Sequence, residues 1–139
     1  MRTGNVAILL LLCAVGLSAQ SDEAAARKPL EAYLSAHASG NPEHLVGAFH
    51  PQARIQGVSL DGTFANWTLD EDRTRFSGKP AVDEAQRKRT IDFVEINGNA
   101  GTAKITLEYP QAVFTDYFVL LKHDGQWKIM NKVFTVAKR

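Results

Sequence analysis

The sequence predicts an α+β domain in which helices come first and an antiparallel sheet comes last. Helical spacing of apolar residues occurs early in the chain, whereas the second half contains four runs of strand composition, at 87–96, 102–109, 112–123 and 127–137. The dipeptides Asn97-Gly98 and Asp124-Gly125 each separate two of these runs. Such dipeptides are the strongest short-range signals for a β-hairpin. An order of helices followed by hairpin-connected strands is typical of an α+β fold.

Residues 1–19 are predicted to form a cleaved signal peptide. Met1-Arg2 provides a short positive start, an apolar run follows at 6–17, and Ala19 places a small residue at the expected cut. A membrane-spanning helix is the rival interpretation, but the run is about 12 residues and a bilayer needs roughly 20. Cys13 raises a lipoprotein anchor as a further alternative. We therefore expect export in a bacterium, to the periplasm or as a secreted protein.

The mature chain, residues 20–139, is expected to be one domain. Cleavage would remove Cys13, the only cysteine, so the domain must be stabilised by its core and not by disulfides. The chain carries 16 Lys and Arg against 15 Asp and Glu. This balance indicates no basic face, so nucleic acid is not an expected partner. No segment after the signal peptide is apolar enough to suggest a membrane span.

Two helices are predicted before the first strand. The first covers about 21–39, where Leu30, Tyr33, Leu34 and His37 share one face at helical spacing. Pro29 should kink this helix or mark a restart within it. The second covers 42–49, with a proline in its first turn, and His50-Pro51 ends it because the residue before proline avoids the α region.

The middle of the chain predicts two short strands and a third helix. The strands lie at 53–58 and 63–66, and Asp61-Gly62 forms the turn between them. Thr68 and Glu71 have the spacing of a capping box, in which each residue satisfies a backbone N–H of the other. The helix that they start is expected to run to about Phe76.

The order helix, helix, two strands, helix, four strands resembles the nuclear transport factor 2-like superfamily, and most closely its putative lumazine-binding family. The residues that carry the resemblance lie at 49–53, which reads Phe-His-Pro-Gln-Ala, at 62–67 and at 114–134. The resemblance implies a cone: a bent antiparallel sheet wrapped around helices, with a ligand pocket at its open end. It also implies a homodimer formed through the sheet. The superfamily includes enzymes and binding modules, so the fold leaves function open.

Cross-strand pairing in the last hairpin predicts which side chains face the interior. Counting outward from the Asp124-Gly125 turn pairs Lys122 with Trp127 and Leu120 with Ile129, and then Phe118 with Asn131 and Asp116 with Val133. The predicted inner face carries Phe114, Asp116, Phe118, Leu120, Trp127, Ile129, Asn131 and Val133. The opposite face would hold Tyr117, Val119, Leu121, Met130 and Phe134. A β-bulge would shift the register by one residue and exchange Asn131 for Lys132.

Asp116 is the main candidate for chemistry, because a buried carboxylate must be paired, hydrogen-bonded or protonated. As a functional group it would be a general acid or base, or would anchor a ligand. Ketosteroid isomerase, a member of the resembled superfamily, uses carboxylates in an apolar site in this way. The alternative is structural: Asp116 accepts hydrogen bonds from Asn131, Tyr117, Lys132 or backbone groups and only stabilises the sheet.

Tyr33 and His50 are the candidate partners of Asp116. The Tyr33 hydroxyl lies on the inner face of the first helix and would donate to a ligand oxygen, or would only satisfy a core partner. His50 would act as a base or ligand contact, or would cap a helix. Trp67 and Phe76 flank the third helix and are expected to wall a pocket or to fill the core. The predicted ligand contacts are Tyr33, His50, Trp67, Asp116, Phe118 and Asn131.

Motifs for metals and cofactors are missing from the sequence. His37, His44, His50 and His123 show no ligand spacing, so no metal site is expected. We find no Gly-rich phosphate loop or nucleophile elbow, and no cofactor is expected. The Asn66-Trp67-Thr68 sequon is interpreted as structural, because Thr68 has a capping role.

Three hypotheses for function remain. The first is an exported protein that binds a small apolar or aromatic molecule in an apolar cone. The second is a small lyase, isomerase or hydrolase that uses Asp116 with Tyr33 or His50, whose side chains must then converge on one substrate position. The third is a non-catalytic dimerisation module.

Overall fold

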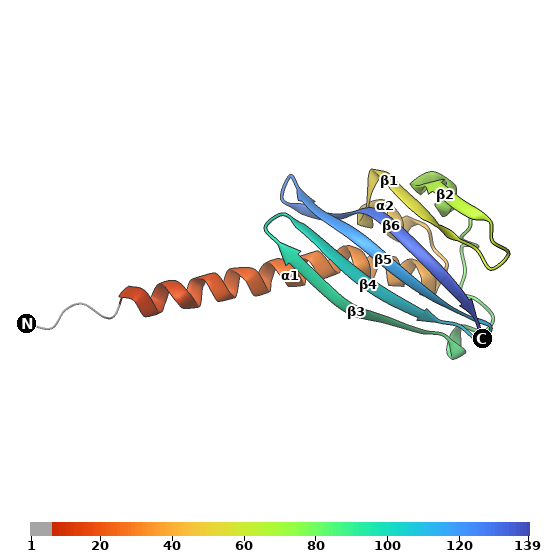
Figure 1. Ribbon diagram of the computed structural model, residues 1–139, viewed down its shortest axis with the longest axis horizontal. Helices are drawn as coiled ribbons and strands as arrows, with labels where there is room; N and C mark the ends of the chain where they lie inside the picture. The colour runs from red at the N-terminus through yellow and green to blue at the C-terminus, as the bar shows by residue number, and fades with distance from the viewer. Residues whose placement is uncertain (1–6) are drawn as a thin grey trace, which may run out of the picture.

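The computed structural model describes the backbone of residues 7–139 and the side chains from residue 20 onward. Residues 1–6 of the predicted signal peptide, and the side chains of the rest of it, lie outside the described residues. The elements in chain order are α1 Ala7–Ser39, α2 Glu43–Ala48, β1 Phe49–Val58, β2 Phe64–Thr68, α3 Leu69–Arg73, a 3₁₀ turn Glu84–Gln86, β3 Lys88–Asn97, β4 Ala100–Glu108, β5 Ala112–His123 and β6 Gln126–Lys138 (Figure 1). The α+β prediction is therefore confirmed.

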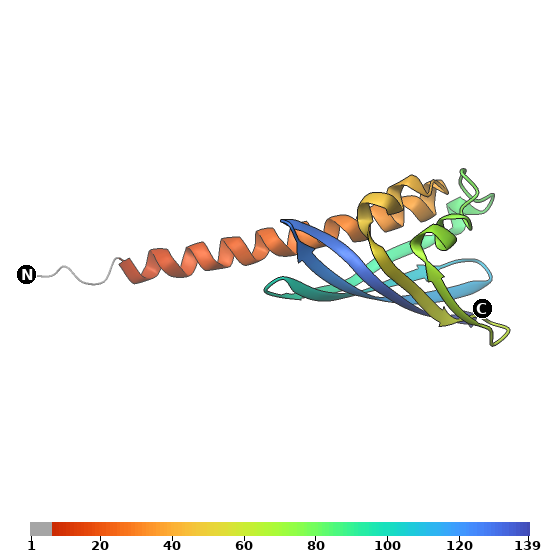
Figure 2. The same cartoon turned by 90° about the horizontal axis from the view of Figure 1, so that it is seen from above.

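The strands form a six-stranded sheet in the order β2-β1-β6-β5-β4-β3. β1 pairs with β6 in parallel, and the other neighbouring pairs are antiparallel. The sheet twists around the C-terminal half of α1 and around α2, which lie against one of its faces (Figures 1 and 2). It stays open, as the predicted cone requires. Among the described residues, no helix combines the length and the apolar character needed to cross a membrane.

Helix α1 is longer and more continuous than predicted. It begins at Ala7 and not near residue 21, and it passes Pro29 without the predicted restart. Its first half projects beyond the sheet in both views (Figures 1 and 2). Ala26, Leu30 and Tyr33 are fully buried against the sheet, and Pro29 is itself buried. Burial of this apolar stripe offsets the backbone hydrogen bond that a proline removes from a helix.

Several predicted boundaries shift around α2 and α3. Helix α2 ends at Ala48, before the predicted stop at His50-Pro51, because Phe49, His50 and Pro51 belong to β1. The Thr68–Glu71 capping box is confirmed: the Thr68 N–H donates to Glu71 Oε2 at 2.7 Å, and the Glu71 N–H donates to Thr68 Oγ1 at 3.2 Å. Helix α3 ends at Arg73 and not near Phe76.

The β5–β6 hairpin follows the predicted register only near its turn. Asp124 and Gly125 have positive φ, and Leu120 pairs with Ile129 as predicted. Beyond this pair a bulge at Met130 shifts the register. Val119 then pairs with Asn131, Phe118 with Lys132, and Asp116 with Phe134.

The bulge exchanges the faces of the remaining residues of β6, because side chains alternate along a strand. The prediction that Asn131 and Val133 face the interior is therefore wrong, as is the placing of Phe134 on the outer face. Lys132 and Phe134 are buried, whereas Val133 is 47% exposed. The parallel pairing of β1 with β6 is irregular at the same level, between Phe49 and Arg54, where Pro51 cannot donate a ladder hydrogen bond.

Candidate functional site

A cavity of about 460 Å³ opens between the end of α1, α3 and the inner face of the sheet. Most of its lining is apolar, and seven of the lining side chains are aromatic rings. These rings are Tyr33, His37, Trp67, Phe76, Tyr109, Phe114 and Phe134. They come from α1, from both halves of the sheet and from the segment after α3. The cavity therefore exists only once segments distant in the sequence have packed together.

A polar cluster of Tyr33, Asp116 and Lys132 lies among these apolar side chains. Tyr33 Oη donates to Asp116 Oδ2 at 2.5 Å and accepts from Lys132 Nζ at 3.1 Å. The Lys132 and Asp116 charges are 3.8 Å apart. Asp116 is 1% exposed, Tyr33 is fully buried and Lys132 is 7% exposed. All three line the cavity, so the cluster places buried polar groups in its wall.

The Tyr33 hydroxyl is held in its protonated form. Burial raises the pKa of Tyr33 well above its usual value, and the charge of Asp116 raises it further. The neutral hydroxyl donates its proton to Asp116 and offers its lone pair to Lys132. Tyr33 therefore connects the anion and the cation, and Lys132 retains N–H groups that Tyr33 does not use.

Two pairs of aromatic rings form separate parts of the wall. Trp67 and Phe134 stack with centroids 5.9 Å apart at 18°, and Tyr109 and Phe114 lie 5.7 Å apart at 57°. An arginine covers each pair: Arg75 lies 3.9 Å from the Trp67 centroid, and Arg87 lies 4.2 Å from that of Tyr109. Flat, polarisable walls of this kind suit a planar ligand.

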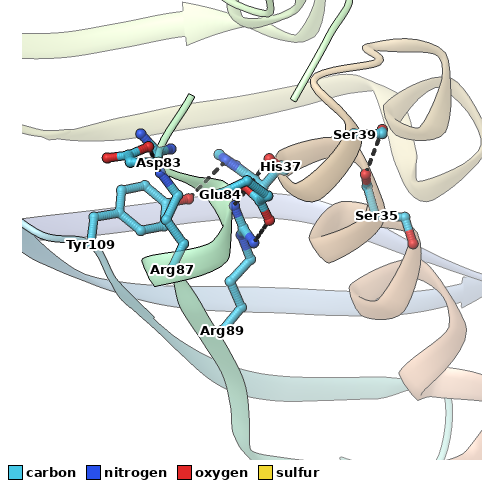
Figure 3. A network of polar contacts seen from close by, with 8 residues as sticks. All are labelled: Ser35, His37, Ser39, Asp83, Glu84, Arg87, Arg89 and Tyr109. Carbon is cyan, nitrogen blue, oxygen red and sulfur yellow. Dashed lines mark hydrogen bonds and ion pairs between the residues drawn. The ribbon is translucent and has the colours of Figure 1, made fainter. Parts of the chain in front are cut away.

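A network around His37 fixes the wall on the side of α1 (Figure 3). His37 Nδ1 and the Tyr109 hydroxyl are 3.4 Å apart, and Arg89 donates to the His37 carbonyl at 3.1 Å. Arg89 is also paired with Glu84, which lowers the pKa of Glu84 through its hydrogen bond. The His37 ring meets the Tyr33 and Phe76 rings edge-on.

Acidification should destabilise the protein through His37. Burial lowers the pKa of His37 well below its usual 6.5, and the nearby charges of Lys132, Arg89 and Arg87 lower it further. Below about pH 6.5 the unfolded chain binds a proton at His37, whereas the folded chain leaves this ring neutral. The stability that His37 contributes is therefore complete above pH 6.5 and is lost as the pH falls. We expect His37 alone to lower the free energy of unfolding by up to about 1.4 kcal/mol for each pH unit.

Urea unfolding at pH 7.5 and pH 5.0 measures the effect. His37→Gln is the control, because it retains a polar side chain without the titration. The variant should lose less stability between the two pH values than the wild-type protein. Equal losses would show that other groups cause the acid sensitivity.

The structure brings together some of the residues that the sequence singles out. Tyr33, Trp67 and Asp116 line the cavity, and so does Phe76. Phe118 is buried behind it, with its ring edge-on to Tyr33 at 5.2 Å. Asp116 and Tyr33 converge as the enzyme hypothesis requires. Their role toward a ligand stays a prediction.

His50 and Asn131 lie apart from the cavity. His50 Nδ1 accepts the backbone N–H of Gln52 at 3.2 Å, because Phe49 takes the inward position on β1 and the next residue points away. Asn131 faces away because of the bulge and donates to Gln56 at 3.5 Å. Neither residue converges with Asp116.

Sequence reasoning missed Lys132, His37, Asp72 and Tyr109 as site residues. Lys132 entered the predictions through the bulge alternative and as one possible structural partner of Asp116, but not as a ligand contact. His37 could have been predicted as a site residue, since it lies one helical turn after Tyr33 on the same face. Asp72 is 5% exposed on α3, and burial raises its pKa. Tyr109 follows the end of β4, where no periodic pattern predicts its direction.

Comparisons with known proteins agree with this architecture. The family model described as Putative lumazine-binding matches residues 21–135. A curated protein named Aldolase FrzH, from Cladobotryum sp, is 25% identical over 104 residues, which cover 73% of this chain and 81% of that protein.

Solved structures give the same fold. An NTF2-like protein of unknown function from Methylobacillus flagellatus has a TM-score of 0.71 at 31% identity, over 84% of this chain and 93% of that one. An NTF2-like protein of unknown function from Shewanella baltica has a TM-score of 0.75 at 24% identity, over 84% and 94% of the two chains. These likenesses support the cone fold with helices against an open sheet.

Proposed function

The chain belongs to the putative lumazine-binding family, and from this premise we propose that it is an exported protein that binds a small, partly aromatic molecule in its cavity. The observation that carries the proposal is a cavity of about 460 Å³ with aromatic walls and one convergent polar cluster. Small-molecule sites are typically concave and apolar, with a few polar groups that orient the ligand. Tyr33, Asp116 and Lys132 would supply that orientation.

Ligand binding should change the fluorescence of Trp67, which lies in the cavity wall. The other tryptophan, Trp127, is buried outside the lining. Within the described residues its indole N–H has no hydrogen-bond partner, so Trp127→Phe breaks no hydrogen bond and leaves Trp67 as the single reporter. A library of flat aromatic compounds would be titrated into this variant.

Native mass spectrometry on protein purified from its own envelope fraction gives an independent test. A binding protein should show a saturable fluorescence change or a reproducible adduct. Trp67→Phe should abolish the optical signal while calorimetry still detects binding. A protein that shows neither signal across the library, and only its bare mass, would contradict the proposal.

Export is the part of the proposal that concerns the first residues. The described side chains that anchor α1 would all remain after a cut behind Ala19: Asp22 pairs with Lys122 at 2.7 Å, and Ala26 is fully buried. The intact mass of the protein from its native cell should correspond to residues 20–139. A mass that retains residues 1–19 would contradict cleavage.

A second candidate function is a small lyase or isomerase. The favouring observation is the Tyr33–Asp116 hydrogen bond beside Lys132, together with the similarity to a protein named as an aldolase. Asp116 would remove a proton from a carbon next to a carbonyl, and Lys132 would hold the resulting enolate oxygen. His50, which lies outside the cavity, has no part in this scheme.

Solvent exchange tests the second candidate without knowledge of the substrate. Small aldehydes and ketones would be incubated with the protein in D₂O, and deuterium at the carbon next to the carbonyl would be followed by NMR. An enzyme of this kind should accelerate exchange, and Asp116→Asn should abolish the acceleration. No acceleration by the wild-type protein would eliminate this chemistry for the compounds tested and leave binding as the function.

A further inference from the structure

The charges that line the cavity are unequal in sign. Four described lining residues are cationic and two are acidic: Arg75, Lys79, Arg87 and Lys132, against Asp72 and Asp116. Lys132 faces Asp116 and Arg75 faces Asp72, each at 3.8 Å. The counter-charge of Arg87 is Asp83, at 2.7 Å, which does not line the cavity. Three of the four cations are thus paired with a carboxylate, and Lys79 supplies the remaining positive charge. A positive charge within low-dielectric walls attracts anions.

Lys132 has donors available for an occupant of the cavity. Its ammonium group carries three N–H donors, and Tyr33 Oη accepts one of them at 3.1 Å. Asp116 Oδ2 is 3.8 Å away, which exceeds hydrogen-bond distance. A buried ammonium group is stable only when it is paired and hydrogen-bonded. An anionic oxygen in the cavity would complete the bonding of Lys132.

The two carboxylates of the cavity are poorly placed to repel an anion. Asp116 is 1% exposed, and its Oδ2 already accepts the Tyr33 hydroxyl at 2.5 Å. Asp72 faces Arg75 at 3.8 Å, so a cation lies beside its charge. A ligand therefore meets the Lys132 cation more readily than either carboxylate charge.

The aromatic walls restrict the shape of the ligand. Trp67 and Tyr109 belong to separate ring pairs, and the Arg75 and Arg87 guanidinium groups lie over their rings. A guanidinium group over a ring keeps N–H donors with which a carboxylate can pair. Positive charge therefore extends from the rim of the cavity to Lys132.

We propose that the ligand is a planar aromatic acid whose anionic oxygen accepts hydrogen bonds from Lys132 and whose ring lies between the walls of Trp67 and Tyr109. The inference rests on the proposed function and adds the chemical class of the ligand. Lys132 is the anchor because it is buried beside the cavity with unused donors. Arg75 and Arg87 attract the acid without holding its anionic oxygen in the bound state.

Matched pairs of acid and amide test the proposal. The probes are 2-naphthoate with 2-naphthamide and indole-3-carboxylate with indole-3-carboxamide, titrated by calorimetry at pH 7.5. Each pair shares a ring system and differs in the charge of one group. A hydrogen bond to a charged group contributes enough to favour the acid by about tenfold or more. This comparison uses the wild-type protein and needs no variant.

Two variants then locate the anchor. Asp116→Asn/Lys132→Met removes both buried charges together, so neither is left unpaired, and it should abolish the preference for the acid while the amide still binds. Arg75→Gln removes a rim cation and should keep the preference. Circular dichroism and thermal unfolding would establish that both variants are folded.

The outcomes separate this inference from the function on which it rests. Acid and amide binding equally well would overturn the acid preference and leave small-molecule binding intact. A preference that survives the double variant but disappears in Arg75→Gln would overturn Lys132 as the anchor. If neither the probes nor the neutral aromatic library bind, the proposed function fails together with the inference.

Discussion

Replacing Lys132 by methionine should destabilise the protein by about 3–5 kcal/mol, the usual effect of leaving one member of a buried ion pair without its partner. Asp116 would stay at 1% exposure with only the Tyr33 hydroxyl to stabilise its charge. Asp116→Asn should have a comparable effect, because the Lys132 ammonium would then be unpaired. The measurement is urea unfolding of both single variants at pH 7.5.

The double variant Asp116→Asn/Lys132→Met should recover most of that loss. Removing both charges leaves no isolated buried ion, and neutral replacements of buried pairs are often as stable as the original. The two changes should therefore be strongly non-additive. Additive losses would show that the two charges do not interact across their 3.8 Å separation.

Lys104→Met is the matched control for the loss of a lysine. Lys104 is paired with Asp92 at 3.5 Å, but both side chains are about one-third exposed, at 32% and 28%. Water screens such a pair, and its loss should change the stability by less than about 1 kcal/mol. A Lys104→Met effect as large as that of Lys132→Met would argue against burial as the cause.

Gly40→Ala should be the second severe change, at about 3 kcal/mol, since it combines a left-handed backbone with a close contact. Gly40 has a φ of +70°, and a Cβ there would lie 2.0 Å from the carbonyl oxygen of Lys79. The carbonyl of Gly40 also accepts the N–H of Gly78 at 2.8 Å. The segment that it holds carries Ser77, Lys79 and Ala81 into the cavity lining. The variant should therefore lose ligand affinity as well as stability.

Gly62→Ala is the control for Gly40→Ala. Gly62 has a φ of +83°, but a Cβ there would meet no atom within 4 Å. It should lose only the roughly 1–2 kcal/mol that a left-handed conformation costs an alanine. Urea midpoints of the two variants give the difference, which measures the contact with Lys79. Equal midpoints would mean that the segment around Lys79 moves away from the new Cβ at little energetic cost.

Local patterns were sufficient to predict much of the fold. The Asp124-Gly125 turn, the Thr68–Glu71 capping box and the buried stripe of α1 each depend on residues a few positions apart. Such patterns reflect backbone sterics and hydrogen bonds within one turn or one hairpin. The inward direction of Asp116 was predicted for the same reason, although its predicted partner across the hairpin was wrong.

The composition of the site depends on contacts between distant segments. Lys132 points inward because of the bulge at Met130. At this level β6 pairs with β5 on one side and, on the other, with β1, whose pairing is interrupted around Pro51. Tyr33 meets Asp116 across 83 positions of sequence. No local periodicity encodes such a meeting.

The amino-acid sequence thus sufficed for the α+β class, the hairpin turn and the burial of Asp116, because these follow from short-range geometry and the alternation of apolar residues. The family followed from the resemblance of three of its segments to known proteins. Tertiary packing decided which of the candidate partners reach that carboxylate, gathered the cations around the cavity and placed His50 and Asn131 outside it. Their positions depend on strand register and on how the loops dock, and a one-residue bulge reverses every side chain beyond it.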